Sequence, residues 1–176
     1  MAKNVRAREP VETISEPMTD ATALPPLVVA MRQKILQACA KGDIEALRIP
    51  IDWNELRPLF ERGARRAPGE DPVARLKAMS ADPAGQEIIA LLRAVLRQAF
   101  VKVVRGPTTL YVWPAFALRP PADPTPAERE IMLTCVRFAD LASPLADGRA
   151  MPMELAIGAD GVWHTFWTSP GPRGQG

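Results

Sequence analysis

The chain has 176 residues, a formal net charge of +2 from 22 basic and 20 acidic side chains, and a hydrophobic share of 47%. A chain of this length forms one domain whose core buries about 70% of the unfolded surface, so folding needs neither a metal nor a disulfide. The small net charge excludes a protein that binds polyanions through its overall field. The apolar runs are too short to cross a bilayer or to form a secretory signal, and we expect a cytoplasmic protein with no membrane partner.

The helical elements come first in chain order. Residues 1–23 are polar and predict a disordered arm. A helix over 25–42 follows, and its spacing places four apolar side chains on one face: Val28, Met31, Ile35 and Cys39. Residues 43–63 predict two short helical turns with Asp43 and Asp52 as N-caps.

Two further helices begin at Asp-Pro pairs, over 71–80 and 82–100. The second is strongly amphipathic, and its predicted buried face consists of Ile88, Leu91, Leu92, Val95, Leu96, Ala99 and Phe100. A later helix begins at a capping box formed by Thr125 and Glu128. That helix is predicted to bury Ile131, Met132, Cys135, Phe138 and Ala139.

Two β-hairpins complete the predicted elements. The first joins 101–105 to 110–118 around the turn "GPTT", and the second joins 153–158 to 162–167. Residues 169–176 predict a disordered tail. The fold class is α+β: a helical N-terminal layer packed on a small antiparallel sheet of two hairpins with one intervening helix, all in a single domain over 24–168.

The turn in "IGADGVWHTFWTSP" decides which way His164, the only histidine, points. A two-residue turn at Asp160 and Gly161 would oppose Ile157 to His164. A three-residue loop shifts the register by one and gathers the large apolar side chains on one face: Met153, Leu155, Ile157, Trp163 and Trp167. We favour the second register because a buried tryptophan contributes roughly 2 to 3 kcal/mol.

In that register His164 and Glu154 lie diagonally across the hairpin. A carboxylate beside an imidazole suits acid-base chemistry, and a solvated cross-strand pair has the same sequence. On the preceding hairpin Tyr111 and Trp113 alternate with Leu110 and Val112, so one pair faces the core. An aromatic pair on the other face would mark a binding surface.

Arginines are concentrated in "ERGARRAPG", which contains Arg62, Arg65 and Arg66. Such a loop can hold a phosphate or an acidic partner through bidentate hydrogen bonds, or it can be a solvated loop. Because no aromatic residues are interleaved with the arginines, we expect no nucleic-acid partner.

Several chemistries lack their usual motifs. The sequence has no Walker loop, no dinucleotide-binding glycine pattern and no G-x-S-x-G elbow. One histidine with Cys39 and Cys135 cannot form a closed structural zinc site without a carboxylate or a second chain. We therefore expect no cofactor and no metal, and we favour buried free thiols over a disulfide.

Three stretches in order, "LYVWPAFA", "TPAE" and "IGADGVWHTFW", resemble an uncharacterised alphaproteobacterial family. Its members usually have a Tyr-Val-Trp-Pro strand, a Thr-Pro-Ala-Glu helix start and a Gly-x-Asp-Gly-x-Trp terminal hairpin. The likeness spans 24–167. It implies a shared architecture and transfers no catalytic residue. The stretch "ACAKGDIEALR" is also similar to the opening of nuclear-transport-factor-2-like domains, which implies a cone-shaped fold with a pocket.

Two functional hypotheses follow. The first is a non-enzymatic module that binds a protein partner, with five candidate binding residues and no catalytic residue: Tyr111, Trp113, Glu154, Trp163 and His164. The second is a small-molecule pocket or an acid-base enzyme of the cone type, in which His164, Glu154 and Asp52 converge.

Overall fold

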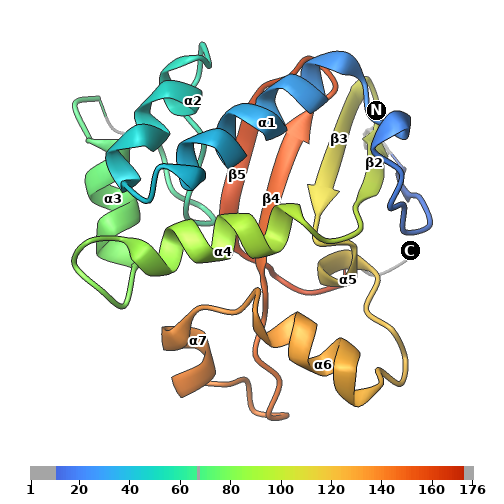
Figure 1. Ribbon diagram of the computed structural model, residues 1–176. Helices are drawn as coiled ribbons and strands as arrows, with labels where there is room; N and C mark the ends of the chain where they lie inside the picture. The colour runs from blue at the N-terminus through green and yellow to red at the C-terminus, as the bar shows by residue number, and fades with distance from the viewer. Residues whose placement is uncertain (1–10, 67, 173–176) are drawn as a thin grey trace, which may run out of the picture.

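A five-stranded antiparallel sheet organises the computed structural model, which describes residues 11–66 and 68–172 (Figure 1). The strands lie side by side in chain order: β1 (Glu12–Ile14), β2 (Val101–Arg105), β3 (Thr108–Trp113), β4 (Met153–Gly158) and β5 (Trp163–Thr168). Among the described residues, four α-helices precede β2: α1 (Pro26–Ala40), α2 (Arg48–Asp52), α3 (Pro72–Met79) and α4 (Gln86–Leu96). Three more separate β3 from β4: α5 (Ala115–Leu118), α6 (Pro126–Leu133) and α7 (Phe138–Ala142). The α+β class is confirmed, whereas the layout has one more strand and two more intervening helices than expected.

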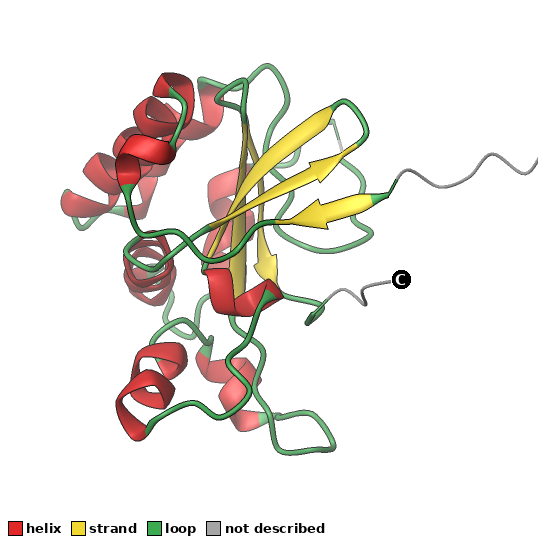
Figure 2. Ribbon diagram, turned by 90° about the vertical axis from the view of Figure 1, so that its right-hand side faces the viewer, coloured by secondary structure: helices red, strands yellow, loops and turns green. Residues whose placement is uncertain are grey.

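The helices α1 and α4 cover one face of the sheet (Figure 2). The predicted α1 face, Val28, Met31, Ile35 and Cys39, is buried, as are the α4 residues Ile88, Leu91, Leu92, Val95 and Leu96. The sheet contributes its own buried row: Tyr111, Trp113, Met153, Leu155, Ile157, Trp163 and Phe166. The Phe100 ring joins the two layers, since its centroid lies 5.3 Å from that of Trp113. The opposite face carries a smaller cluster: Val101, Val103, Val112, Ala115, Leu118 and Ala156.

The predicted caps behave in three ways. Asp43 and Asp71 accept hydrogen bonds from Glu45 N and Val73 N at the starts of their helices, as N-caps do. Asp82 reaches four residues along and accepts from Gln86 N at the start of α4. Asp52, in contrast, is the last residue of α2 and does not cap the next turn.

Residues 11–23 belong to the segment expected to form a disordered arm, and the structure corrects this expectation. Ile14 of β1 pairs with Val103, and Met18 exchanges two backbone hydrogen bonds with Phe100, of 2.8 and 2.9 Å. These contacts use main-chain groups, which a polar sequence offers as well as an apolar one. Ser169, expected to begin a disordered tail, is buried. Residues 1–10 and 173–176 lie outside the described residues.

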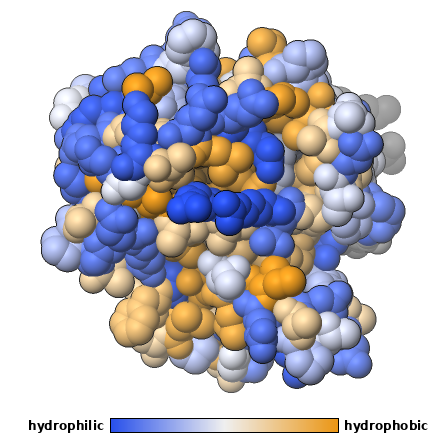
Figure 3. Space-filling model, in the orientation of Figure 1, coloured by the Kyte–Doolittle hydropathy of each residue, from blue (hydrophilic) through white to orange (hydrophobic). Residues whose placement is uncertain are grey.

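The segment after β3 corrects a second expectation. Phe138 is 66% exposed and Ile131 46% exposed, so the predicted continuous apolar face is wrong; only Cys135 of its five members is buried. The predicted helix is divided in two: α6 ends at Leu133 and α7 begins at Phe138, and neither helix has a buried residue. Figure 3 shows apolar surface over this lower part of the molecule.

A β-bulge at His164 combines both hairpin registers. Near the turn, Ile157 pairs with Trp163, as a three-residue loop requires, and Gly161 has φ +83°. Beyond His164, Leu155 pairs with Phe166, as the two-residue turn would have given. One extra residue in β5 therefore places both Trp163 and Phe166 in the core. Trp167, expected on that face, pairs with Glu154 on the other.

The bulge makes a stability prediction. We expect Phe166→Ala to lower the free energy of unfolding by about 3–5 kcal/mol, because a fully buried ring is replaced by a cavity. Trp167→Ala should cost less than half as much, since Trp167 is only half-buried. Urea unfolding of both variants measures the difference, and a larger loss for Trp167→Ala would contradict the register.

Candidate functional site

The predicted aromatic binding residues lie in the core. Tyr111, Trp113 and Trp163 are 5%, 1% and 0% exposed. The Trp163 indole donates through Nε1 to the carbonyl of Thr165 at 2.9 Å, and its ring packs edge-on against Phe60. Their large apolar area therefore stabilises the fold and is not presented to a partner.

The three candidate acid-base groups lie on different elements. Glu154 of β4 is 1% exposed and accepts a hydrogen bond from Ser169 Oγ at 3.0 Å. Asp52 is exposed at the end of α2, and His164 is the bulge residue of β5. None of the three lines either of the two pockets described below.

The imidazole of His164 packs over Gly158, where a Cβ atom would come within 2.7 Å of Nε2. Partial burial lowers the pKa of His164 below its ordinary value of 6.5; Arg66 lowers it further, and Asp160 opposes the shift. The imidazole ring therefore favours the neutral form. The backbone carbonyl of His164 accepts a hydrogen bond from Leu59 N. His164 thus joins two segments of the fold.

The lowered pKa predicts a pH dependence. Because the unfolded chain binds a proton more readily at this position, stability present above pH 6.5 is lost as the pH falls through the folded pKa. Titration of the single imidazole by NMR should give a pKa below 6.5. His164→Gln should remove this part of the loss in unfolding free energy between about pH 7 and pH 5. A pKa above 6.5 would contradict the burial argument.

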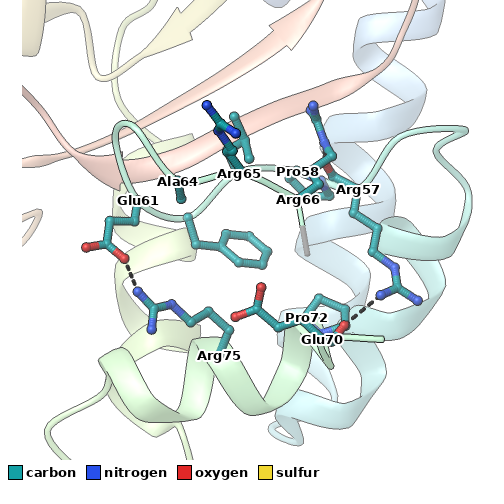
Figure 4. Close-up of a pocket in the computed structure, with 11 residues that line it drawn as sticks. Arg57, Pro58, Glu61, Ala64, Arg65, Arg66, Glu70, Pro72 and Arg75 are labelled. Atoms are coloured by element: carbon teal, nitrogen blue, oxygen red, sulfur yellow. Dashed lines mark hydrogen bonds and ion pairs between the residues drawn. The ribbon is translucent and has the colours of Figure 1, made fainter. Parts of the chain in front are cut away.

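Two adjoining pockets of about 220 and 450 Å³ open beside β5 and share Phe60, Glu61 and Arg75. We call them together the arginine cleft. Its walls come from the segment between α2 and α3, from α3 itself, from α7 with the residue before it, and from the end of β5. Its arginines are Arg57, Arg62, Arg65, Arg66, Arg75 and Arg137. Figure 4 shows the smaller pocket, with Arg65 and Arg75 on opposite sides.

The connection between α2 and α3, which carries most of the cleft arginines, is anchored at two points, Leu59 and Asp71. At its start, Leu59 forms a short parallel bridge to β5, donating to His164 O and accepting from Phe166 N, each at 2.9 Å. At its end, Arg48 of α2 holds Asp71 with two hydrogen bonds of 2.7 and 2.8 Å. This bidentate contact lowers the pKa of Asp71, so the pair stays ionised at neutral pH.

The positive charge of the cleft is only partly compensated. Among the described residues, six arginines and three carboxylates, Glu61, Glu70 and Asp140, line the cleft, which leaves +3 in a chain whose net charge is +2. Arg75 pairs with Glu61, and Arg137 holds Asp140 at 2.9 and 3.2 Å. Within the described part of the chain, Arg57 donates only to the carbonyl of Glu70, and Arg66 only to the carbonyl of Arg57.

The remaining two arginines, Arg62 and Arg65, make no ion pair or side-chain hydrogen bond within residues 11–66 and 68–172. The sequence identified these two and Arg66 as an anion-binding candidate. It did not indicate that Arg75 and Arg137 join them, because that requires α3 and α7 to meet beside β5.

The two cysteine thiols lie in the core, away from the arginine cleft. Cys39 and Cys135 are free and buried, and burial raises the pKa of their thiols to about 12 and about 11. Among the described residues, no group of three or more potential ligands could hold a metal ion. The same residues include no helix that is both long and apolar enough to cross a membrane.

The thiols give a direct test of this burial. At pH 8 we expect neither Cys39 nor Cys135 of the folded protein to react with a disulfide reagent, because the reactive thiolate is not formed. Both should react once denaturant unfolds the chain. Rapid modification of either thiol before unfolding would show that the core opens.

Comparison with known proteins finds no matching family model, no matching curated protein and no matching solved structure.

Proposed function

We propose that the protein is a non-enzymatic binding module whose arginine cleft holds a partner bearing several carboxylate or phosphate groups. The uncompensated charge of the cleft carries this proposal: it holds a net +3, more than the whole chain. A concave site lined by one sign of charge concentrates ligands of the other sign.

All six cationic groups that the described residues place in the cleft are guanidinium groups, which supports a ligand with carboxylate or phosphate oxygens. Guanidinium groups bind carboxylates and phosphates through two parallel hydrogen bonds, which a lysine cannot do. Arg62 and Arg65 have these donors available, while Arg57 and Arg66 are oriented by carbonyl groups that leave their charge in place. The cleft therefore combines oriented cations with two adaptable ones.

The composition of the pockets favours binding over catalysis. Among the described residues, no histidine, cysteine or serine lines either pocket, and the hydroxyl of Thr168 already donates to Asp140 at 2.9 Å. Glu61 and Asp140 are paired with Arg75 and Arg137. These groups suit the recognition of charge and leave no activated nucleophile.

The proposal is tested with the double variant Arg62→Glu/Arg65→Glu of the full chain. The probe is a fluorescein-labelled hexaglutamate peptide, and its anisotropy reports binding at low salt. We expect the affinity to fall by at least about tenfold, because two charge-assisted contacts are replaced by repulsion. Binding of the wild-type protein should also weaken as salt is added.

The matched control is the double variant Arg129→Glu/Arg149→Glu, which also replaces two arginines by glutamates but outside both pockets. Arg129 and Arg149 are exposed and contact only the surface carboxylates of Asp123 and Asp147 within the described residues, so their replacement should change stability little. Equal affinities for the control and Arg62→Glu/Arg65→Glu would overturn the proposal, because they would show a response to net charge alone.

A further inference from the structure

The larger pocket of the arginine cleft has apolar side chains among its charged ones. Ala78 and Met79, at the end of α3, and Trp167 of β5 line it together with three of the arginines. Ala78 is exposed and the other two are half-buried, so all three offer apolar surface to a ligand. Binding pockets typically combine apolar walls with a few charged groups. A ligand that carries only charges would leave this apolar surface in water.

The helix α7 carries exposed apolar side chains next to the same pocket. Arg137, which immediately precedes α7, and Asp140 of α7 both line the pocket. Phe138 and Leu141 each follow one of these residues in the chain and are 66% and 43% exposed. Because residues three apart lie on the same side of a helix, Phe138 and Leu141 form a row beside the charged row. We call these two residues the α7 pair.

Hydrogen bonds attach α7 to two other elements. Glu87 of α4 accepts from Phe138 N at 2.6 Å. Asp140 accepts from the hydroxyl of Thr168 at 2.9 Å, which attaches α7 to β5, and from Arg137 at 2.9 and 3.2 Å. The exposure of the α7 pair is therefore built into the fold, and a ligand that binds the pair meets a helix already held in place.

The core makes no use of the α7 pair. Neither α6 nor α7 contains a buried residue. The chain before and after α7 exposes three more large apolar side chains, Ile131, Leu133 and Leu145, and Figure 3 shows the apolar surface of this part of the molecule. A gathering of exposed apolar side chains marks a binding surface.

The charge of the adjoining cleft decides which partner fits this surface. A symmetric dimer places the same surface of both copies against each other. Pairing through α7 would therefore bring two clefts, each with a net +3, toward one another, and their repulsion opposes it. A partner that has carboxylates for the cleft and apolar side chains for α7 matches both features.

Resting on the proposed function, we propose that the partner is an acidic segment of another protein in which large apolar side chains accompany the carboxylates. Its carboxylates bind the arginines of the cleft. Its apolar side chains pack against Phe138 and Leu141 and against the exposed parts of Met79 and Trp167. Inorganic phosphate or polyglutamate satisfies only the arginines, so the apolar side chains of the partner add affinity beyond that of its charges.

The test uses two fluorescein-labelled peptides of equal charge, Glu-Glu-Leu-Glu-Glu-Leu and Glu-Glu-Ser-Glu-Glu-Ser, whose affinities are measured by anisotropy at low salt. We expect the wild-type full chain to bind the leucine peptide about fivefold more tightly, because the leucines remove apolar surface from water. For Phe138→Ala/Leu141→Ala the two affinities should lie within about twofold of each other. This variant changes no charge, so its affinity for the serine peptide should match that of wild type at every salt concentration.

The matched control is Leu27→Ala/Ile49→Ala, which shortens two exposed apolar side chains on α1 and α2 outside both pockets. Their exposed fractions, 58% and 56%, are similar to those of the α7 pair. We expect the control to keep the wild-type preference for the leucine peptide. Since all four side chains are exposed, both variants should fold, and urea unfolding checks this.

The outcomes separate the two proposals. Equal affinity of wild type for the two peptides overturns the apolar contact, as does an equal loss of preference in the control. Dimers of wild type that Phe138→Ala/Leu141→Ala abolishes in sedimentation also overturn it, because a second copy then covers the surface. If Arg62→Glu/Arg65→Glu weakens both peptides while wild type does not distinguish them, the arginine cleft stands as a site for charge alone. If Arg62→Glu/Arg65→Glu binds both peptides as tightly as wild type, the cleft itself fails.

Discussion

The extra residue in β5 is the constraint on which the rest of the structure depends. A regular strand would place either Trp163 or Phe166 in the helix-facing core, whereas the bulge at His164 places both there. It also leaves the carbonyl of His164 pointing outward, where Leu59 binds it and brings the arginine-bearing segment beside the sheet. Core packing and the position of the cleft thus have one local origin.

The sequence predicts the elements whose signal is local. The apolar spacing of α1 and α4 identifies their buried faces, and the Thr125–Glu128 capping box forms as expected, because each signal lies within one helical turn. The edge strand β1 gives no such signal. It is held by main-chain pairing to β2, which lies almost ninety residues away.

The candidate site likewise combines residues that are close in sequence with residues that only the packing of helices brings together. Arg62, Arg65 and Arg66 form a visible cluster in the sequence, whereas Arg75 and Arg137 join them only through the packing of α3 and α7 around β5. The aromatic residues fail as surface candidates for a related reason. Alternation along a strand predicts two faces but not which one a helix covers, and α4 covers the face that contains Trp113 and Trp163.

The anchors at Leu59 and Asp71 have an entropic consequence for recognition. Between them the backbone already has fixed ends, so a ligand that enters the cleft orders mainly arginine rotamers rather than a whole loop. Immobilising one such side chain costs about 0.5–1.5 kcal/mol, less than ordering a free segment of that length. A preorganised site of this kind extends the residence time of its complex more than it accelerates encounter.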